Sequence, residues 1–505
     1  MEDDENDDLI DDLMFNLLVK EVGVAEEKDA IEGEEYPMTT DGSRERKVRR
    51  NNYDRGPKEK KSNDDPATTI QWMRWIADPA IAFPHTAQGK RFRHLFRIPF
   101  PIFTAIVKTC KESGNKLFNY AVTDAAGQYS IPVEVKILFS IRVLAGGMKV
   151  NDAAELTQFM SNSTGNSFFT QFVVDFADMF EHIHIRPLEG EELLRSMASY
   201  ARLGLAGCLG SIDATIFPWG KCSKEMHNAC DGDKGVGVLF EVVVTHEKLI
   251  LAVGGPFPST INDKISVKYS EFMAALKSKV IASNIKYRLR TGPGVDDFIE
   301  LSAVYVIADG GYLQWPQIIC GYPYSSDPFK YRFSDWVASV RKDVECLFGI
   351  LKMRFFYLKH PAQVQSGELL RAIFVTCCIL NNMIMRADGL DTLWESDVNW
   401  SAMNDSAEED HEEEDVDAYM PVQFDPATFQ TAILADMEPL DFHGQLDEVE
   451  HDFHTLRDLL ARHLHFTYAS GNLRWPKVRK HCVDKGVDLN QIIRLHFPGA
   501  GDDIV

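Results

Sequence analysis

Two aspartates and a glutamate occupy positions where a carboxylate is unusual. Asp213 lies inside the apolar stretch GCLGSIDATIFPW (207–219), and Asp309 ends the apolar stretch 303–312 before two glycines. Glu345 lies beside a helical apolar stripe in VECLFGILKMRFF. A carboxylate within or at the end of a buried strand is costly to desolvate unless it is paired or binds a cation. These three residues are therefore the first candidates for chemistry.

Three carboxylates that converge at one edge of a sheet would repel each other unless cations lay between them. Two Mg²⁺ or Mn²⁺ ions suit such a site, because hard cations prefer oxygen ligands. A pair of these metals activates a water or a 3′-hydroxyl and stabilises the leaving oxygen at a phosphodiester. Each carboxylate alone also has a plainer interpretation, such as a turn start for Asp309 or a solvated surface for Glu345.

The elements that would position these carboxylates alternate in type after residue 205. The order of strand and helix patterns is β-β-β-α-β-α, which predicts an α/β layer architecture with adjacent hairpin strands and a tight turn at Glu247. The predicted strands are 207–219, 237–246, 248–257 and 303–312, and the predicted helices are 270–283, the Glu345 segment, 368–387 and 450–470.

The region before residue 206 has helical apolar spacing. Two of its helices, separated by the turn sequence SNSTGN, are compatible with a helix-turn-helix that reads DNA, and equally with any helical bundle. The predicted helices are 92–112 with a break at Pro101, 133–147, 151–160 and 167–183.

The net charge of −23 is concentrated in two acidic runs, so it says little about a folded core. Residues 1–35 contain 15 acidic residues and two lysines, and residues 405–417 contain nine acidic residues without a lysine or arginine. Runs of this kind are typical of disordered segments. A basic block at 44–61 follows the first run and is a nuclear import signal, a DNA-contacting arm or a solvated linker. Its candidate contacts are Arg46, Lys47, Arg49 and Arg50.

Composition narrows the class of protein. No apolar run reaches the length that spans a bilayer, and the beginning MEDDENDD is the opposite of a signal peptide, so an intracellular protein is expected. The nine cysteines include no CxxC pair, which favours reduced thiols. Cys222, His227 and Cys230 could act as zinc ligands, but no fourth ligand has a recognisable spacing.

Five motifs in order give the chain a family resemblance. They are GSIDATIFPW (210–219), GGPFPSTINDKISV (254–267), YVIADGGYLQWP (305–316), RKDVECLFGILKMRFFYLKHPA (341–362) and CCILNNMI (377–384). Over roughly 90–390, the chain resembles the PIF/Harbinger-type transposases, in particular the plant transposon protein group.

The resemblance implies a fold and a set of site residues. It implies an RNase H-like mixed sheet with flanking helices, a DDE transposase core in which Asp213, Asp309 and Glu345 are catalytic and bind Mg²⁺ or Mn²⁺. Asp263 matches a further acidic position that assists metal binding, although by its sequence alone it is an ordinary Asn-Asp turn. Three cations near Glu345 would lie close to a negative substrate or on a solvated helix face: Lys342, Lys352 and Arg354.

We therefore expect a DDE-type endonuclease or transposase that cleaves DNA at transposon ends in the nucleus. It would bind terminal repeats through the helical region 133–195, act as a homo-oligomer on DNA without a membrane, and use a separate Myb-like DNA-binding partner. One alternative is a host-adopted or decayed relative that binds DNA or protein without cutting. Another is a carboxylate-dependent glycosidase, which predicts a cleft lined with aromatic residues and no metal.

The domain organisation follows from these patterns. A disordered acidic and then basic N-terminus precedes a helical, helix-turn-helix-like region and the nuclease core, and an acidic disordered insert separates that core from a final helical segment. The predicted boundaries are 1–68, 69–205, 206–387, 388–440 and 441–505.

Overall fold

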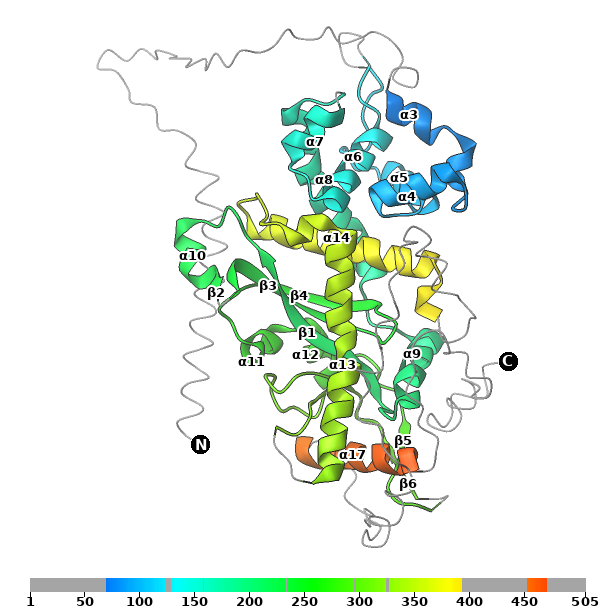
Figure 1. The fold of residues 1–505 in the computed structure, drawn as a ribbon, viewed down its shortest axis with the longest axis vertical. Coiled ribbons are helices and arrows are strands. Elements are labelled where there is room, and N and C mark those ends of the chain that lie inside the picture. Colours follow the sequence, from blue (N-terminus) through cyan, green and yellow to red (C-terminus); the bar gives the residue numbers. More distant parts are fainter. Residues whose placement is uncertain are drawn as a thin grey trace, which may run out of the picture. The chain divides into compact units, whose positions relative to one another are not determined.

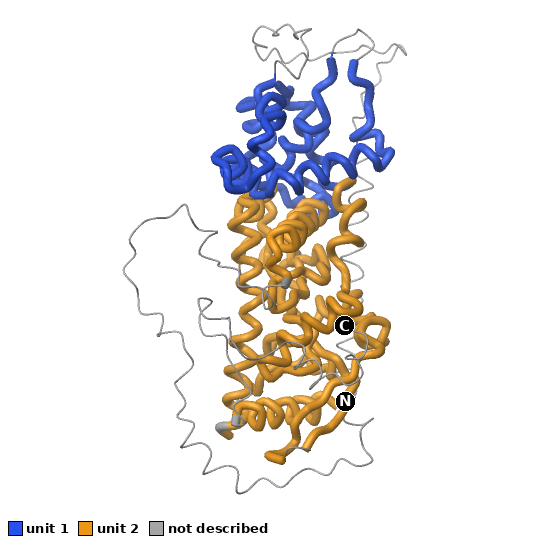
Figure 2. The backbone as a smooth tube through the Cα atoms, turned by 90° about the vertical axis from the view of Figure 1, so that its right-hand side faces the viewer, with its two compact units in different colours: residues 1–174, 221–228, 363–370 blue, residues 175–220, 229–362, 371–505 orange. Residues whose placement is uncertain are grey.

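The computed structural model describes residues 70–123, 129–157, 159–232, 234–294, 297–323, 327–392 and 452–469. The chain forms two compact units (Figure 2). Unit 1 comprises residues 1–174, 221–228 and 363–370, and unit 2 comprises residues 175–220, 229–362 and 371–505. The predicted acidic and basic segments 1–68, 388–440 and 405–417 lie largely or wholly outside the described residues.

Unit 1 is helical, as its sequence predicts, and its core is rich in phenylalanine. Phe92 packs on both Phe96 and Phe103, with ring centroids 4.7 and 5.7 Å apart. The helix α6 is buried on most sides and ends at Gly147, which has a left-handed φ of 62°. The elements are α3 (Gln71–Ile76), η1 (Pro79–Ala82), α4 (Ala87–Phe96), α5 (Phe100–Glu112), α6 (Val133–Gly146), α7 (Val150–Thr157) and the first half of α8 (Asn162–His184).

Two predicted boundaries in the helical region are wrong. The break in 92–112 falls at Arg97, a left-handed residue that caps α4, and Pro101 lies in the first turn of α5. Proline is tolerated there because the first turn has no partner for its missing N–H. Most of the SNSTGN sequence is helical rather than a turn, since α8 already begins at Asn162.

Unit 2 is built on a mixed sheet with helices beside it (Figure 1). Its strand order is β2-β3-β1-β7-β8, and β4 also pairs with β3. The pairs β1–β3 and β3–β4 are antiparallel, whereas β1–β7 and β7–β8 are parallel. The strands are β1 (Cys208–Pro218), β2 (Asp231–Gly232), β3 (Gly235–Val244), β4 (Ile250–Pro258), β7 (Tyr305–Ile307) and β8 (Ile318–Ile319), with β5 (Tyr287–Arg290) and β6 (Phe298–Leu301) forming a separate hairpin.

This architecture confirms the predicted mixed α/β fold with flanking helices. The three consecutive antiparallel strands and the turn at Glu247 are as expected, and Lys248 has a left-handed φ of 71° in that turn. The sequence did not predict β8 or the β5–β6 hairpin, which are short.

The helix α13 is the longest in unit 2 and contacts both β1 and β3. Figure 1 shows it running along the sheet. Val344, Leu347 and Leu351 are buried, which confirms the predicted apolar stripe. The helical elements of this unit are α9 (Gly190–Arg202), α11 (Asp263–Ser266), η2 (Val267–Tyr269), α12 (Glu271–Lys277), α13 (Pro328–Arg354), η3 (Phe356–Lys359), most of α14 (Gly367–Ala387), η4 (Leu390–Thr392) and α17 (Phe453–Ala469), while α10 (Lys224–Cys230) belongs to both units.

Two helices from the C-terminal part complete the core of unit 2. Phe374 of α14 stacks on Phe240 of β3 at 4.2 Å. By length and composition α14 could cross a membrane, so the expectation that no apolar run is long enough is wrong, but 78% of its apolar window is buried in the protein. That burial is typical of a core helix. The helix α17 contacts α13 and β5, and buries Leu456, Leu459 and Leu460.

Candidate functional site

The end of β7 brings the two predicted aspartates to neighbouring positions. Ser211 of β1 pairs with Ile307, which is the last residue of β7. Asp213 lies two residues beyond Ser211 and Asp309 two residues beyond Ile307, so both follow the last pair in the same register. Neighbouring strands are about 4.8 Å apart. The strand β1 continues to Pro218, whereas its pairing with β7 ends at Ser211. Asp213 therefore has no paired residue on β7.

Helix α13 adds the third predicted carboxylate through an arginine. Arg341 Nη1 donates to Asp213 Oδ2 at 2.7 Å, and its Nη2 lies 2.8 Å from Glu345 Oε1. Arg341 and Glu345 are one helical turn apart, a spacing at which side chains meet. The side chains of Asp213 and Arg341 are 18% and 17% exposed, whereas that of Glu345 is 49% exposed. The guanidinium therefore bridges the first and third carboxylates.

The helix α11 adds the fourth predicted carboxylate. Asn262 caps this helix by accepting from Ile265 N, which places Asp263 in its first turn. A Cβ on Gly311 would lie 2.9 Å from Asp309 Oδ1 and 3.2 Å from Asp263 Oδ2. The two carboxylates thus face the same point beside Gly311, and a side chain there would require them to shift. Asn262 and Asp263 thus start a helical turn, as the sequence alone suggests, and Asp263 also lies near Asp309.

Two of these carboxylates, Asp213 and Asp263, have raised pKa values, first because they are partly buried and then because other carboxylates are near. Burial, Asp309 and Asp213 raise the pKa of Asp263 to about 6. Burial also raises the pKa of Asp213, with Asp309 and Glu345 adding to the rise and Arg341 opposing it. A carboxylate whose neighbours are mostly carboxylates behaves in this way.

Asp213, Asp263, Asp309 and Glu345 fit a divalent cation in their donor chemistry, since all four offer oxygen. Across the described ranges, however, no group of three or more His, Cys, Asp or Glu residues is arranged to hold a metal ion. This statement covers the Cys222, His227 and Cys230 set as well as the carboxylates. Where a cation would bridge Asp213 and Glu345, Arg341 now supplies the positive charge.

Comparison with known proteins finds one family for the central part of the chain. The model of the plant transposon protein family matches residues 185–391, a range that includes all four carboxylates. This part of the chain is similar to PIF/Harbinger-type transposases. A relative described as Protein ALP1-like, from Arabidopsis thaliana, is 22% identical over 323 residues, which are 63% of this chain and 75% of the relative. No solved structure matches the chain significantly.

The sequence did not single out a fifth carboxylate near the other four. Glu241 lies within β3 at 2% exposure, and Ser266 Oγ donates to its Oε2 at 3.3 Å. Burial and the charge of Asp263 raise its pKa to about 7, against the hydrogen bonds of two serines. Its signal was present, because Glu241 is one polar residue inside the apolar run GVLFEVVVTH.

A buried tyrosine, Tyr312, interacts electrostatically with the same carboxylates. The Tyr312 hydroxyl is buried and has no hydrogen-bond partner among the described residues. Burial raises its pKa, and the charges of Glu241, Asp263, Asp213 and Asp309 raise it further. The Tyr312 hydroxyl is thus a neutral hydrogen-bond donor, and the charges of four carboxylates act on it.

The three cations predicted near Glu345 have different surroundings in the structure. Lys352 Nζ donates to Thr215 Oγ1 at 3.1 Å, two residues beyond Asp213 on β1. Arg354 instead donates to Asn381 of α14 at 2.5 Å, and Lys342 is exposed on α13. The predicted contacts Arg46, Lys47, Arg49 and Arg50 lie outside the described residues.

A second missed cluster lies on the buried side of α13. Asp343 is 7% exposed, and its two oxygens contact His246 Nδ1 at 2.5 Å and Lys248 Nζ at 2.7 Å. His246 and Lys248 belong to the β3–β4 turn, so this cluster fixes α13 to the sheet two residues from Glu345. Although burial acts to raise the pKa of Asp343, the interactions with His246 and Lys248 outweigh it and hold the pKa below its ordinary value.

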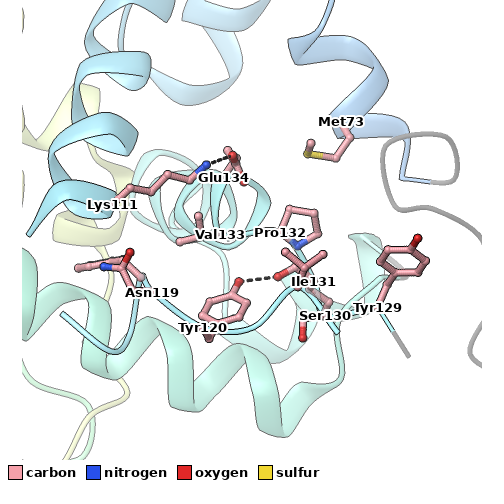
Figure 3. Close-up of a pocket in the computed structure, with 12 residues that line it drawn as sticks. Met73, Lys111, Asn119, Tyr120, Tyr129, Ser130, Ile131, Pro132, Val133 and Glu134 are labelled. Atoms are coloured by element: carbon pink, nitrogen blue, oxygen red, sulfur yellow. Dashed lines mark hydrogen bonds and ion pairs between the residues drawn. The ribbon is translucent and has the colours of Figure 1, made fainter. Parts of the chain in front are cut away.

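Unit 1 has a hollow of its own (Figure 3). Its volume is about 400 Å³, and it lies between α3, the 118–122 segment and the start of α6. Lys111 pairs with Glu134 at its wall, and the Tyr120 hydroxyl donates to the Ile131 carbonyl. Two of its residues are exposed apolar side chains, Val122 and Tyr129.

Proposed function

We propose that this protein is a DDE-type DNA endonuclease or transposase that cleaves phosphodiester bonds at transposon ends. The single observation that carries the proposal is the convergence of Asp213, Asp309, Asp263 and Glu345, from four separate elements, at the end of β7. The strand order supports an RNase H-like core, since three antiparallel strands are followed by two that run parallel to β1.

The carboxylates would hold two divalent cations, Mg²⁺ or Mn²⁺. When bound, these ions supply activation of the attacking oxygen and charge stabilisation of the leaving oxygen. In the reaction, a water oxygen bonds to phosphorus as the bond from phosphorus to the 3′-oxygen breaks, which leaves a 3′-hydroxyl and a 5′-phosphate. The water loses one proton and the departing oxygen gains one. Without metal, the pKa of Asp263 is raised to about 6, and a bound cation would lower it and keep this carboxylate ionised as a ligand.

The wider setting is part of the same proposal. The enzyme would work in the nucleus as a homo-oligomer on DNA, bind terminal repeats through its helical region, and use a separate Myb-like DNA-binding partner.

Manganese binding tests the proposal directly. Calorimetry with Mn²⁺ should give binding in the full chain that is at least about tenfold weaker in Asp213→Asn, because a first ligand is lost. The matched control is Glu300→Gln, an exposed carboxylate of β6 that pairs with Lys286. Each protein is also titrated with a mixed-sequence duplex present, since the substrate phosphate itself supplies oxygen ligands.

Nicking of supercoiled plasmid in Mn²⁺ gives the second readout. Glu345→Gln keeps the side-chain shape and removes a charge, so nicking should be lost. Unchanged metal binding in Asp213→Asn together with unchanged nicking in Glu345→Gln would overturn the proposal.

One observation favours a second candidate, a relative that binds DNA or protein without cutting. Arg341 forms ion pairs with both Asp213 and Glu345, so these two carboxylates share a cation that the chain itself supplies. This candidate predicts that the wild-type protein binds DNA but neither binds Mn²⁺ nor nicks plasmid.

A further inference from the structure

Glu241 lies where the chain after β4 passes over the sheet toward the carboxylates. In the described sheet, β4 pairs with β3, and β1 separates β3 from β7. Asp263 follows Pro258, the end of β4, by five residues, yet it meets Asp309 beyond β7. The segment after β4 therefore passes over β3, and Glu241 is the carboxylate that β3 presents to it.

The side chain of Glu241 lies on the face of the sheet opposite to Asp213. Glu241 pairs with Ala214 of β1, and residues paired across two strands share a face. Asp213 precedes Ala214, and successive side chains of a strand alternate between faces. Phe240, the residue before Glu241, accordingly stacks on α14 on that other face. Glu241 therefore acts on the site through the elements of its own face, not from beside Asp213.

Those elements are α11 and α12, and two buried serines link them to Glu241. The Ser266 hydroxyl lies 3.3 Å from Glu241 Oε2 and also 3.3 Å from the carbonyl oxygen of Asp263. Ser270 is the N-cap residue of α12, but its side chain makes no capping hydrogen bond and instead bonds to Glu241. One carboxylate thus holds both ends of η2, the turn that joins the two helices.

These hydrogen bonds make the position of α11 a condition for burying the carboxylate. Glu241 and Ser266 are both buried, and the neighbours of Glu241 on β3, Phe240 and Val242, are apolar. A buried polar group is unfavourable unless it is hydrogen-bonded. The carboxylate keeps its partners only while α11 and α12 stay against β3, which fixes where Asp263 lies.

We propose that Glu241 is a positioning residue that holds Asp263 against Asp309 through Ser266 and Ser270. It does not contact the cation. The inference rests on the proposed function, because it gives this buried carboxylate a task in the metal site. Residues that orient a metal ligand typically contribute about 10–100-fold to metal affinity.

Hydrogen–deuterium exchange in the metal-free full chain tests the positioning without any cation. The amides of Ile265 and Ser266 bond to the Asn262 carbonyl, so peptides that cover residues 262–270 report on α11. Glu241→Leu has a similar size and no acceptor. Exchange over 262–270 should become at least about tenfold faster in this variant, while peptides of α13 exchange as in the wild type. Glu241→Gln keeps an oxygen acceptor and should retain most of the protection.

Manganese affinity tests whether the positioning acts through Asp263. Calorimetry should show binding about tenfold weaker in Glu241→Leu than in the wild type, and Glu241→Gln should restore most of the affinity. In an Asp263→Asn background, Glu241→Leu should have no further effect, because the ligand that it positions is already lost. If Glu241→Leu does not fold, Ser266→Ala combined with Ser270→Ala removes the hydroxyls instead and should give the same two results.

Phe240→Leu is the matched control. It changes the core of the same strand on the other face, where Phe240 stacks on Phe374, and should lower stability through the cavity that it leaves. Neither exchange over 262–270 nor Mn²⁺ affinity should respond to it. Wild-type exchange over 262–270 in Glu241→Leu would overturn the proposal. Faster exchange with wild-type Mn²⁺ affinity, or an equal loss of affinity in both backgrounds, would overturn it as well.

Failure of this inference can be told apart from failure of the proposed function. Faster exchange over 262–270 in Glu241→Leu, with no Mn²⁺ binding in the wild type, would leave Glu241 holding Asp263 in a protein that binds no metal. Mn²⁺ binding in the wild type, with unchanged exchange in the variant, would leave the metal site standing without this role for Glu241.

Discussion

Helix α13 presents two carboxylates, two residues apart, to opposite environments. Asp343 points into the core, where the Lys248 ammonium and the His246 ring bind one carboxylate. On the other side, Arg341 is shared by Asp213 and Glu345, with Asp309 and Asp263 close by. Their pKa values move accordingly, below the ordinary value for Asp343 and above it for Asp213 and Asp263. The buried cluster is balanced in charge and structural, whereas the other is short of cations and suited to bind them.

The largest expected effect on stability comes from breaking the buried cluster around Asp343. Asp343→Asn leaves Lys248 and His246 without their anion, and removing one partner of a buried ion pair costs about 3–5 kcal/mol of the free energy of unfolding. Urea denaturation at pH 7 measures this. The surface variant Glu300→Gln is the control and should change stability by less than about 0.5 kcal/mol. A loss under about 1 kcal/mol for Asp343→Asn would show that the cluster does not fix α13.

A smaller loss is expected when Arg341, the cation that bridges Asp213 and Glu345 on the other side, is removed. Arg341→Gln should cost about 1–2 kcal/mol at pH 8, less than the first variant because this site is partly open to water. The loss should shrink at pH 5, where the raised pKa values allow some of the carboxylates to take up protons. Arg288→Gln, an exposed arginine of β5, serves as the control for thermal and urea melts. A gain in stability for Arg341→Gln would contradict the shared-cation interpretation.

The smallest effect should be a gain. Asp263 has a pKa raised from 3.8 to about 6 in the folded protein, so the folded state binds its proton more tightly than the unfolded state does. Its contribution to stability is therefore favourable below about pH 4 and is lost as pH rises through 6. Asp263→Asn should stabilise the metal-free protein by about 1 kcal/mol at pH 8 and by nothing at pH 4.

The sign of the pH dependence then separates the two sides of α13. Because the pKa of Asp343 is lowered, its stabilisation is present above pH 4 and is lost as pH falls below that value. Urea melts of Asp263→Asn and Asp343→Asn at pH 4, 6 and 8 compare the two. Equal shifts of Asp263→Asn at all three pH values would refute the charge deficit at the site.

The sequence predicted which kinds of element carry the three candidate carboxylates. It did not predict the ion pairs that form around them. A mid-strand Asp213, a strand-end Asp309 and a helical Glu345 follow from apolar patterning, because a carboxylate stands out in a buried run. Arg341 could have been found from its position four residues before Glu345. The Asp343 cluster could not, because its partners lie 97 and 95 residues away and no local pattern reports such pairing.

The helices and strands also divide into those that the sequence predicted and those that it did not. Helices α6, α14 and α17 were predicted because long apolar periodicity is a local property. The strand β8 and the β5–β6 hairpin have two to four residues per strand, too few for a period to appear. The helix ends at Arg97 and Asn162 were missed because capping and tertiary packing, rather than propensity, decide them.

The described part of unit 2 comes from two stretches of the chain, and α17 is the second of them. The described chain leaves the core at Thr392 and returns at Asp452, and what returns is one helix with buried Leu456, Leu459, Leu460 and Leu464 against the rest of the unit. These contacts do not depend on the covalent connection between the two points. A protease cut between residues 392 and 452 would leave α17 bound as a separate peptide, and a synthetic α17 should restore a chain shortened at residue 392.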